Sequence, residues 1–420
     1  MLHCERCLQL MRLVCILRLL FLTLSNIQSI TERGIYTDLL REFRDRGHDV
    51  CVVCPSERRF GAPTELVARD GVTILRVRTG NITKTGFVEK TVSTALLESQ
   101  FVSTIRKFLS NVKFDLVLYS TPPITLDRVV RFVKGRDHCR SYLLLKDITP
   151  QDLVDMGIIR QGGLIWQYLR RRERCLYSLS DYIGCMSAAN VEYLLKNNDD
   201  IPSARVEECP NSISPRPARD FERSCRSLRG SYGIPDDSVL LVYGGNLGKP
   251  QGLAFLLDIL DEIRSRRDIH VLIVGSGTEY GRIQEHLTNG KHQNVKLMSS
   301  LPKAEYDDLL AECDAGLIFL DPRFTIPNFP SRLTAYMEAS LPVIAATDPN
   351  TDIKDVLRDS GSGYWVLNGD LGGFMAAVDQ LAADATLRRE MGRKGRAHLE
   401  RYYTTSRAYE TIMSHFMGRP

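Results

Sequence analysis

The sequence has no hydrophobic run long enough to cross a membrane. Residues 8–27 are rich in leucine, but Arg12 and Arg18 interrupt them, and the longest uninterrupted run covers only residues 19–24. A transmembrane helix needs about 20 consecutive apolar residues, and the core of a signal peptide is also longer than this run. We therefore expect this segment to form the first core strand, with residues 1–10 as a poorly fitting extension.

The chain also lacks a strong charge of either sign, since 55 basic and 51 acidic residues leave a net charge of +4. This balance indicates neither nucleic acid nor membrane for the chain as a whole, and we expect no nucleic-acid partner. Locally, residues 164–174 place Trp166 and Tyr168 beside four arginines. This pattern is typical of a helix lying on an anionic membrane surface, although a solvated helix end with a buried apolar face would look the same.

The eleven cysteines show no spacing that is typical of a disulfide framework. The pairs Cys4/Cys7 and Cys51/Cys54 are separated by 43 residues, which is far from the compact spacing of a zinc ribbon. Because Cys51 and Cys54 lie in an apolar run, we expect free buried thiols and a reducing compartment. The eight histidines are dispersed, and no Asp-x-Asp motif or Ser/His/Asp set is apparent. We therefore expect neither a metal nor a cofactor.

Apolar runs and helical patterns alternate along the chain, twice over. Strands are expected at 19–24, 50–54, 72–77, 114–119, 141–145 and 182–186, and again at 238–243, 270–274, 295–297, 315–319, 341–345 and 364–367. Repeated β–α units predict an α/β fold of two Rossmann-like domains, with parallel sheets facing each other across a cleft. The Pro-rich segment 209–217 separates domains at 1–215 and 216–400, and a final helix within 401–420 can pack back on the first.

The stretch 328–345 (NFPSRLTAYMEASLPVIA) predicts a turn, a helix and a buried strand. Pro330 suits the first turn of a helix, where Ser331 can offer a hydroxyl and a free N–H. Arg332 adds positive charge to this anion-binding turn, and Glu338 projects from nearly the same face two turns later. The stretch is therefore a candidate holder for a nucleoside diphosphate, with the ribose at Glu338. An ordinary amphipathic helix with a capped start is the alternative.

Two glycine-rich turns follow predicted strands in the second half. The first, residues 243–252, contributes Gly245, Asn246 and Gln251 as candidates for donor binding and Lys249 as a candidate for catalysis. It is neither a P-loop nor a complete Gly-x-Gly-x-x-Gly motif, although its glycines would let the backbone approach a ligand and Lys249 could reach a phosphate. The second turn, 272–277, contains Gly275, where a tight turn is as good an explanation as ligand contact.

In the first half, polar residues follow two of the predicted strands. Arg33 and Gly34 end the loop after the first strand and open a helix, so they are candidates for the acceptor side of the cleft. Lys146 and Asp147 directly follow a core strand, where their side chains would point into the cleft. A charged pair in this position is a candidate for catalysis.

Taken together, these segments resemble retaining glycosyltransferases of family 4, which have the two-domain GT-B fold. The resemblance rests on Pro210-Asn211 before the linker, the glycine-rich turn and the Glu-bearing helix followed by Leu-Pro-Val-Ile-Ala. Three strings are similar to the bacterial polysaccharide branch that includes fucosaminyltransferases: RGIYTDLLREF (33–43), KDITPQDLVDMGII (146–159) and GGNLGKPQG (244–252).

The chain departs from the family pattern at several positions. The family carries two glutamates separated by seven residues; Glu338 matches the second, but Pro330 occupies the place of the first. The family has basic residues at three further positions. Two of these positions are occupied by Asn246 and Gln251 in this chain, and the third lies near Lys146. The duty of binding the diphosphate would then move to Arg332, helped by Lys249.

The resemblance implies transfer of a hexosyl or N-acetylhexosaminyl group from a UDP-linked donor, with retention and without a metal. The implied catalytic residues are Arg332, Lys249, Lys146 and Asp147, and the implied donor-binding residues are Gly245, Asn246, Gln251, Gly275, Ser331 and Glu338. The implied partners are a lipid-linked (polyprenyl diphosphate) acceptor and the cytoplasmic face of the inner membrane, where capsule, O-antigen or exopolysaccharide is made. A GT-B sugar-nucleotide epimerase and an inactive GT-B scaffold are the alternatives.

Overall fold

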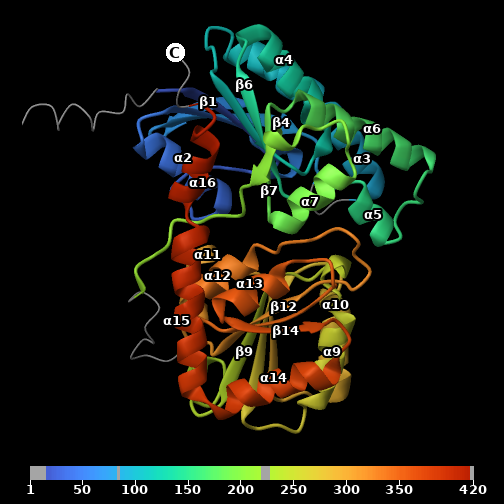
Figure 1. Ribbon diagram of the computed structural model, residues 1–420, viewed down its shortest axis with the longest axis vertical. Helices are drawn as coiled ribbons and strands as arrows, with labels where there is room; N and C mark the ends of the chain where they lie inside the picture. Colours follow the sequence, from blue (N-terminus) through green and yellow to red (C-terminus); the bar gives the residue numbers. More distant parts are fainter. Residues whose placement is uncertain (1–15, 83–85, 219–227, 417–420) are drawn as a thin grey trace, which may run out of the picture.

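Two separate sheets organise the chain, and each forms the centre of one domain (Figure 1). The computed structural model describes residues 16–82, 86–218 and 228–416. The extension at residues 1–10 and the Cys4/Cys7 pair lie outside these ranges. In the described chain, no helix has the length and apolar character that crossing a membrane requires.

The first sheet has eight strands in the order β3-β4-β2-β1-β5-β6-β7-β8. All neighbours are parallel except β3, which runs antiparallel to β4. Leu19, Leu20, Phe21 and Leu22 have no exposed surface, so the expected first core strand is confirmed. The strands are β1 (Arg18–Leu22), β2 (Asp49–Glu57), β3 (Glu65–Arg69), β4 (Val72–Thr79), β5 (Leu116–Ser120), β6 (Arg140–Leu145), β7 (Tyr182–Cys185) and β8 (Val206–Glu208).

The second sheet is entirely parallel, in the order β11-β10-β9-β12-β13-β14. Its strands are short apolar runs, and β12 and β13 are buried along their whole length, as expected for a parallel sheet covered on both faces. The strands are β9 (Val239–Asn246), β10 (Ile269–Ser276), β11 (Val295–Met298), β12 (Ala315–Phe319), β13 (Val343–Thr347) and β14 (Gly363–Leu367).

Helices connect the strands and cover both sheets (Figure 1). Those of the first domain are α2 (Ile35–Asp45), α3 (Phe87–Phe108), α4 (Asp127–Asp137), α5 (Gln151–Asp155), α6 (Leu164–Leu179) and α7 (Ala188–Lys196). Those that follow are α8 (Leu228–Ser231), α9 (Ala254–Glu262), α10 (Tyr280–Gly290), α11 (Lys303–Leu310), α12 (Arg332–Glu338), α13 (Ile353–Ser360), α14 (Leu371–Ala383), α15 (Ala385–Tyr402) and α16 (Thr405–Met413). Short 3-10 turns are η1 (Arg58–Phe60), η2 (Ile124–Leu126), η3 (Ser203–Arg205) and η5 (Lys249–Gln251).

The last two helices carry the chain from the second domain back to the first (Figure 1). Helix α15 packs on α12 and α13 of the second domain, whereas α16 packs on α2 of the first. Tyr409, Ile412 and Met413 on α16 are buried in a core cluster of the first domain. At the junction, Ile213 of the linker donates to the carbonyl of Tyr403 at 3.0 Å, so the outgoing and returning segments pair.

Five helices or strands were not expected from the sequence: β3, β8, α5, α8 and α13. Strand β3 is an antiparallel edge strand with no fully buried residue, β8 has only three residues, and α13 is a short helix between two strands. Such short or half-exposed segments lack the apolar run by which core strands are recognised. The expectation of free buried thiols in β2 is confirmed, and burial raises the pKa of Cys51 to about 12 and that of Cys54 to about 11.

Candidate active site

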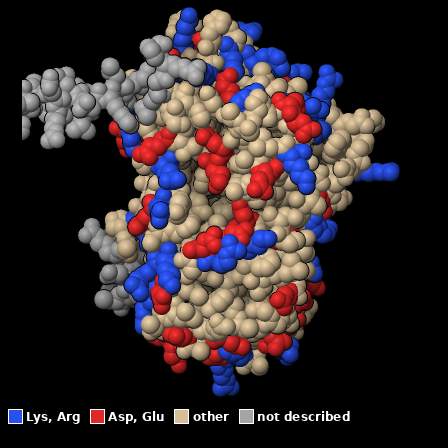
Figure 2. Space-filling model, in the orientation of Figure 1, with Lys and Arg blue, Asp and Glu red and all other residues tan. Residues whose placement is uncertain are grey.

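A cavity of about 1230 Å³ lies between the two domains. Strand order reverses around β1 in the first sheet and around β9 in the second, and loops at the carboxyl ends of these and neighbouring strands line the cavity. Open parallel sheets bind ligands at such points. Basic and acidic side chains alternate over the face shown in Figure 2, so no large area of one sign surrounds the cavity on this side.

The glycine-rich turn after β9 forms part of the second-domain wall. A Cβ atom on Gly244 would lie 1.8 Å from the hydroxyl of Tyr306, and one on Gly275 would lie 2.0 Å from the carbonyl oxygen of Gly245. Gly275 therefore allows two strand ends to pack, which favours the tight-turn interpretation of that residue. Gly245 has a φ of +130° and is exposed to the cavity together with Asn246.

Arg332 is the cation of this wall. Its guanidinium carbon lies 4.5 Å from the centre of the Tyr243 ring, and its Nη2 donates to Oε1 of Gln251. Its Nη1 is buried and has no hydrogen-bond partner among the residues that the structure describes. An unpaired buried N–H on a charged group is costly, so a ligand oxygen at this point of the cavity would be strongly favoured.

Helix α12 differs from the expected helix at its start. It begins at Arg332 and has seven residues, so Pro330 and Ser331 form the turn that precedes it. The hydroxyl of Ser331 caps no backbone N–H, although the residue lines the cavity. The cavity wall at this point therefore depends on the Arg332 side chain, because so short a helix contributes little dipole of its own.

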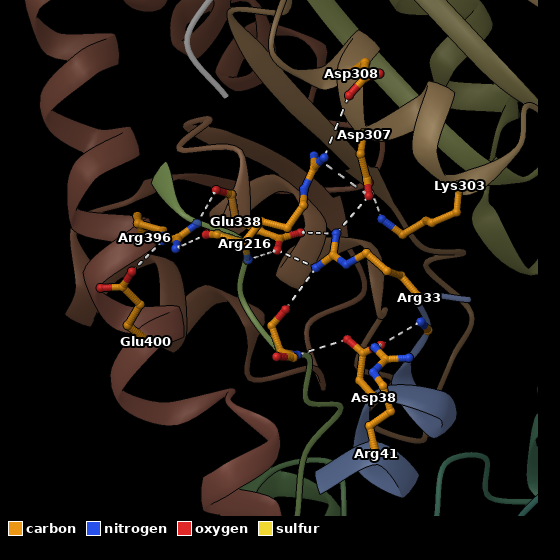
Figure 3. Close-up of polar contacts among 12 residues, drawn as sticks. Arg33, Asp38, Arg41, Arg216, Lys303, Asp307, Asp308, Glu338, Arg396 and Glu400 are labelled. Atoms are coloured by element: carbon orange, nitrogen blue, oxygen red, sulfur yellow. Dashed lines mark hydrogen bonds and ion pairs between the residues drawn. The ribbon is translucent and has the colours of Figure 1, made fainter. Parts of the chain in front are cut away.

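Glu338 at the other end of α12 is already paired. Its side chain is 1% exposed, and Oε1 accepts hydrogen bonds from Nη2 of Arg33 at 2.6 Å and from the backbone N–H of Arg216 at 2.8 Å (Figure 3). Oε2 has one long contact, 3.3 Å, with Nη1 of Arg33. The carboxylate that we expected to hold a ribose thus binds an arginine of the first domain, and only Oε2 retains acceptor capacity.

Arg33 joins the two domains. Besides Glu338, it contacts Asp307 of α11 at 2.9 Å and the carbonyl of Ser214 in the linker at 3.0 Å (Figure 3). Gly34 follows it, and its N–H donates to Oδ1 of Asp38 at 3.0 Å at the start of α2. Both predicted acceptor-side residues line the cavity, but the Arg33 side chain reaches the second-domain wall.

Lys146 and Asp147 lie at the carboxyl end of β6, and both line the cavity. Their backbone N–H groups donate to Oγ1 of Thr121, at 2.9 Å and 3.2 Å, which fixes the turn. Desolvation in the depth of the cavity lowers the pKa of Lys146 to about 8 and raises the pKa of Asp147. The Asp147 side chain remains open to the cavity even though protein surrounds it on the other sides.

One predicted residue is not brought to the cavity. Lys249 is exposed in η5 and is absent from the cavity wall, because the turn directs it to solvent. Sequence reasoning also missed Tyr36, Asp307 and Tyr306. Tyr36 and Tyr306 line the cavity, and Asp307 binds Arg33. Each lies on a helix as an ordinary amphipathic residue, so no local signal distinguishes it.

The second domain of this chain matches a known protein family, and solved structures share the fold of both domains. Residues 238–384 match the family described as Glycosyl transferases group 1. The protein named Probable glycosyltransferase WbjE, from Pseudomonas aeruginosa, is 23% identical over 282 residues, which are 64% of this chain and 68% of that protein. Against two further curated relatives, the chain spans about half of their length, 49% in each case.

Solved structures match over nearly the whole chain. WaaG, a glycosyltransferase involved in lipopolysaccharide biosynthesis, has a TM-score of 0.64 at 13% identity, covering 94% of this chain and 99% of that one. HepE of Anabaena, solved in complex with UDP and glucose, has a TM-score of 0.68 at 14% identity, covering 96% and 100%. These likenesses confirm the expected α/β class of two parallel-sheet domains. The chain therefore has the two-domain GT-B fold, and its residues 238–384 are similar to the group 1 glycosyltransferases.

Proposed function

We propose that this protein is a retaining glycosyltransferase of family 4. It moves a hexosyl or N-acetylhexosaminyl group from a UDP-linked donor to a lipid-linked acceptor in cell-surface polysaccharide synthesis. The family match and the named relatives support sugar transfer, and the neighbour solved with UDP and glucose supports a nucleotide-sugar donor. The donor, the acceptor and the stereochemistry are our inference.

The unpaired Nη1 of Arg332 is the observation that carries the proposal. It is buried in the wall of the cavity that the exposed residues Gly245 and Asn246 also line, and we assign anionic oxygens of the donor to this part of the wall. In sugar transfer the leaving diphosphate gains negative charge as the anomeric bond breaks. A fixed guanidinium stabilises that charge more in the transition state than in the ground state, which is how such a group accelerates a reaction.

Lys146 and Asp147 line the same cavity as Arg332 but belong to the first domain, and we assign them to the acceptor. In a front-face mechanism the acceptor hydroxyl attacks the sugar on the side that the diphosphate leaves, so its proton can pass to a departing phosphate oxygen. Asp147 would orient that hydroxyl, and Lys146 would add positive charge. In this scheme no carboxylate nucleophile and no metal ion is required.

Binding and product formation together test the function. Calorimetric titration with UDP should give saturable binding, and Glu338→Ala should weaken it by about 1–3 kcal/mol, the usual value of hydrogen bonds to a charged group. Incubation of UDP-sugars with membrane lipid extract should yield a glycosylated lipid and free UDP. An epimerase would convert the donor without lipid, and absence of UDP binding would indicate an inactive scaffold.

We also propose that the protein binds the cytoplasmic face of the inner membrane through α6 and the loop before it. Leu164 is 85% exposed and Ile158 is 64% exposed, and Ile165 and Tyr168 are exposed beside them. Arg171 and Arg174 are exposed on the same helix. Apolar side chains with adjacent arginines suit an anionic lipid surface.

Two of the arginines expected on this surface face inward. Arg170 pairs with the buried Glu173, and Arg172 contacts Glu98 at 2.5 Å and Asp127 at 2.6 Å. A membrane test should therefore leave both of them unchanged, because breaking a buried ion pair by removing one partner destabilises the protein by about 3–5 kcal/mol.

Sedimentation with phosphatidylglycerol vesicles tests the membrane proposal. Wild type should pellet at low salt and be released at high salt, because screening weakens the arginine contribution. Arg171→Gln with Arg174→Gln should reduce pelleting, and Leu164→Ser with Ile165→Ser should abolish it. Arg128→Gln is the matched control, since Arg128 is exposed on another helix. Equal pelleting of all variants would contradict the proposed surface.

A further inference from the structure

Three possible metal ligands meet on the second domain, away from the cavity. Asp261 near the end of α9 lies 3.1 Å from Nε2 of His286 on α10, measured from its Oδ1. The same carboxylate oxygen lies 3.2 Å from Nε2 of His292, in the turn after α10. The two imidazole rings stack with their centres 5.3 Å apart, and the three donor atoms all lie within 4.8 Å of one another. None of the three residues lines the cavity.

His292 is the residue that points to a ligand. Its side chain is 0% exposed, and among the residues that the structure describes neither ring nitrogen makes a hydrogen bond of good geometry, although Nε2 lies 3.2 Å from Oδ1 of Asp261. A Cβ atom on Gly290 would lie 2.3 Å from Nε2 of His292, so the chain has a glycine where the donor edge of this ring needs room. Buried polar atoms are rarely left unsatisfied, and a bound ion would satisfy Nε2.

We propose that Asp261, His286 and His292 bind one divalent transition-metal ion of the zinc type, with solvent completing its coordination. Two imidazoles and one carboxylate suit Zn²⁺, Ni²⁺ or Cu²⁺, whereas Mg²⁺ and Ca²⁺ prefer oxygen ligands alone. Tetrahedral ligands at about 2.0–2.1 Å from an ion are about 3.3 Å from each other. The two measured nitrogen–oxygen separations are close to that value.

The ion would act as a structural link. It would connect the end of α9 to the turn that follows α10, on the part of the domain remote from Arg332. Burial favours the neutral imidazole of His292, which is the form that binds metal, because desolvation lowers its pKa. The positive charge of nearby Arg264 would repel a bound metal ion, and the negative charge of the Asp261 carboxylate offsets this repulsion.

The spacing of these residues conceals the group in the sequence. Asp261 precedes His286 by a complete strand, and the two histidines are separated by the end of a helix and a turn. Our expectation that the chain binds no metal rested on the absence of local motifs, and this group is assembled only when α9 and α10 pack side by side.

Metal titration of the chelator-treated full chain tests the proposal. Zn²⁺ should bind with one ion per chain and raise the unfolding temperature, while Mg²⁺ should do neither. His286→Ala and Asp261→Asn should each weaken Zn²⁺ binding about 10-fold or more, since even outer ligands of such sites matter by 10–100-fold. His292→Ala should do the same, but its burial makes the two more exposed positions the primary variants.

Matched controls separate this site from other ligands. His415 forms a single pair with Glu207 at 2.8 Å, so His415→Ala should leave Zn²⁺ binding unchanged. Co²⁺ should bind without the charge-transfer absorption of a thiolate ligand, which excludes the cysteines. Wild-type protein that binds no Zn²⁺, or His286→Ala and Asp261→Asn variants that bind as well as wild type, would overturn the proposal.

Discussion

At the scale of single residues, Arg332 at the start of α12 combines a positive charge with a buried N–H donor, Nη1, that has no hydrogen-bond partner among the described residues. Its neighbours are the Tyr243 ring and the Gln251 amide, neither of which is anionic. Arg332 is half-buried with its Nη1 fully buried, and it has no carboxylate partner in the part of the chain that the structure describes, which is unusual because proteins rarely bury an unpaired charge. In our proposal the missing anion is the diphosphate of the donor.

We expect Arg332→Ala to reduce turnover by about 10²-fold or more, because the charge that stabilises the leaving group is lost. Arg332→Lys should restore only part of the activity, since an ammonium cannot make two parallel hydrogen bonds. Steady-state kinetics with the donor sugar would measure both effects. Lys249→Ala is the matched control and should retain activity, because Lys249 lies outside the cavity. If Lys249→Ala lost activity and Arg332→Ala retained it, Lys249 would be the residue that binds the diphosphate.

From the position of Lys146, directly after β6, we expect kcat/KM to depend on pH. Because desolvation lowers the pKa of Lys146 to about 8, the ammonium loses its proton as the pH rises through that value. If the charged form assists transfer, kcat/KM should fall above about pH 8. A pH–rate profile of wild type and Lys146→Met would test this. The variant should be slower at pH 7 and should lack the fall, and an unchanged fall would show that another group titrates.

At the scale of elements, α16 holds the chain end against the first domain through a histidine. Leu17 donates its N–H to Nδ1 of His48 at 3.1 Å, so Nε2 carries the proton and faces the Tyr409 hydroxyl at 2.7 Å. Protonating Nδ1 would set it against the Leu17 N–H. Burial and the nearby Arg46 lower the pKa of His48 accordingly.

This contact predicts how stability depends on pH. The pKa of His48 is lower in the folded state than the unfolded value of 6.5, so the unfolded state binds more protons on acidification. The contribution is complete above about pH 6.5 and is lost as the pH falls toward the folded pKa. Urea unfolding from pH 7.5 to 5 should show that wild type loses more stability, relative to its value at pH 7.5, than His48→Gln does. An identical loss in the variant would contradict the role of His48. The same lowering at His270, His292 and His398 acts in the same direction, whereas the raised pKa values of Asp152 and Asp348, both about 6, act in the opposite direction.

At the scale of the whole molecule, one guanidinium holds the two domains together at the cavity. Arg33 binds two carboxylates of the second domain, and both of those side chains are 1% exposed. Asp307 also pairs with Lys303, whereas Arg33 is the cation that pairs with Glu338 among the residues that the structure describes. Arg33 thus occupies Glu338, which we expect the donor ribose to use, so donor binding and the domain contact share one carboxylate.

We expect Arg33→Ala to lower the stability of the ligand-free protein by about 3–5 kcal/mol, because it removes the cation that pairs with the buried Glu338 carboxylate. UDP should then stabilise the variant more than it stabilises wild type, since Glu338 is free to accept ribose hydroxyls. Thermal unfolding with and without UDP would measure both effects. Arg18→Ala, which removes an exposed pair with Asp49, is the control and should change neither. A smaller UDP effect in Arg33→Ala would show that Arg33 assists donor binding.

The positions of most core strands along the chain and the position of the cleft could be inferred from the sequence, whereas the order of the strands within each sheet comes from the structure. In runs such as 19–24 and 341–345, the side chains that point to either face of the strand are apolar. This pattern is typical of a parallel sheet with helices on both faces. Since ligands bind at the carboxyl ends of parallel strands, Gly245, Arg332, Lys146 and Asp147 could be placed at the cavity in advance, and all four line it.

Tertiary structure alone decided which charges meet. Arg33 and Glu338 are 305 residues apart, yet they form one ion pair across the domain boundary. Arg172 turned inward to Glu98, Lys249 turned outward to solvent, and Asp261 came to lie beside His286 and His292. The physical reason is that burial patterns are local and repeat along the chain, whereas the partner of a charge depends on how distant elements pack. The sequence by itself determined the elements and the cleft, and the packing of the two domains determined the chemistry within it.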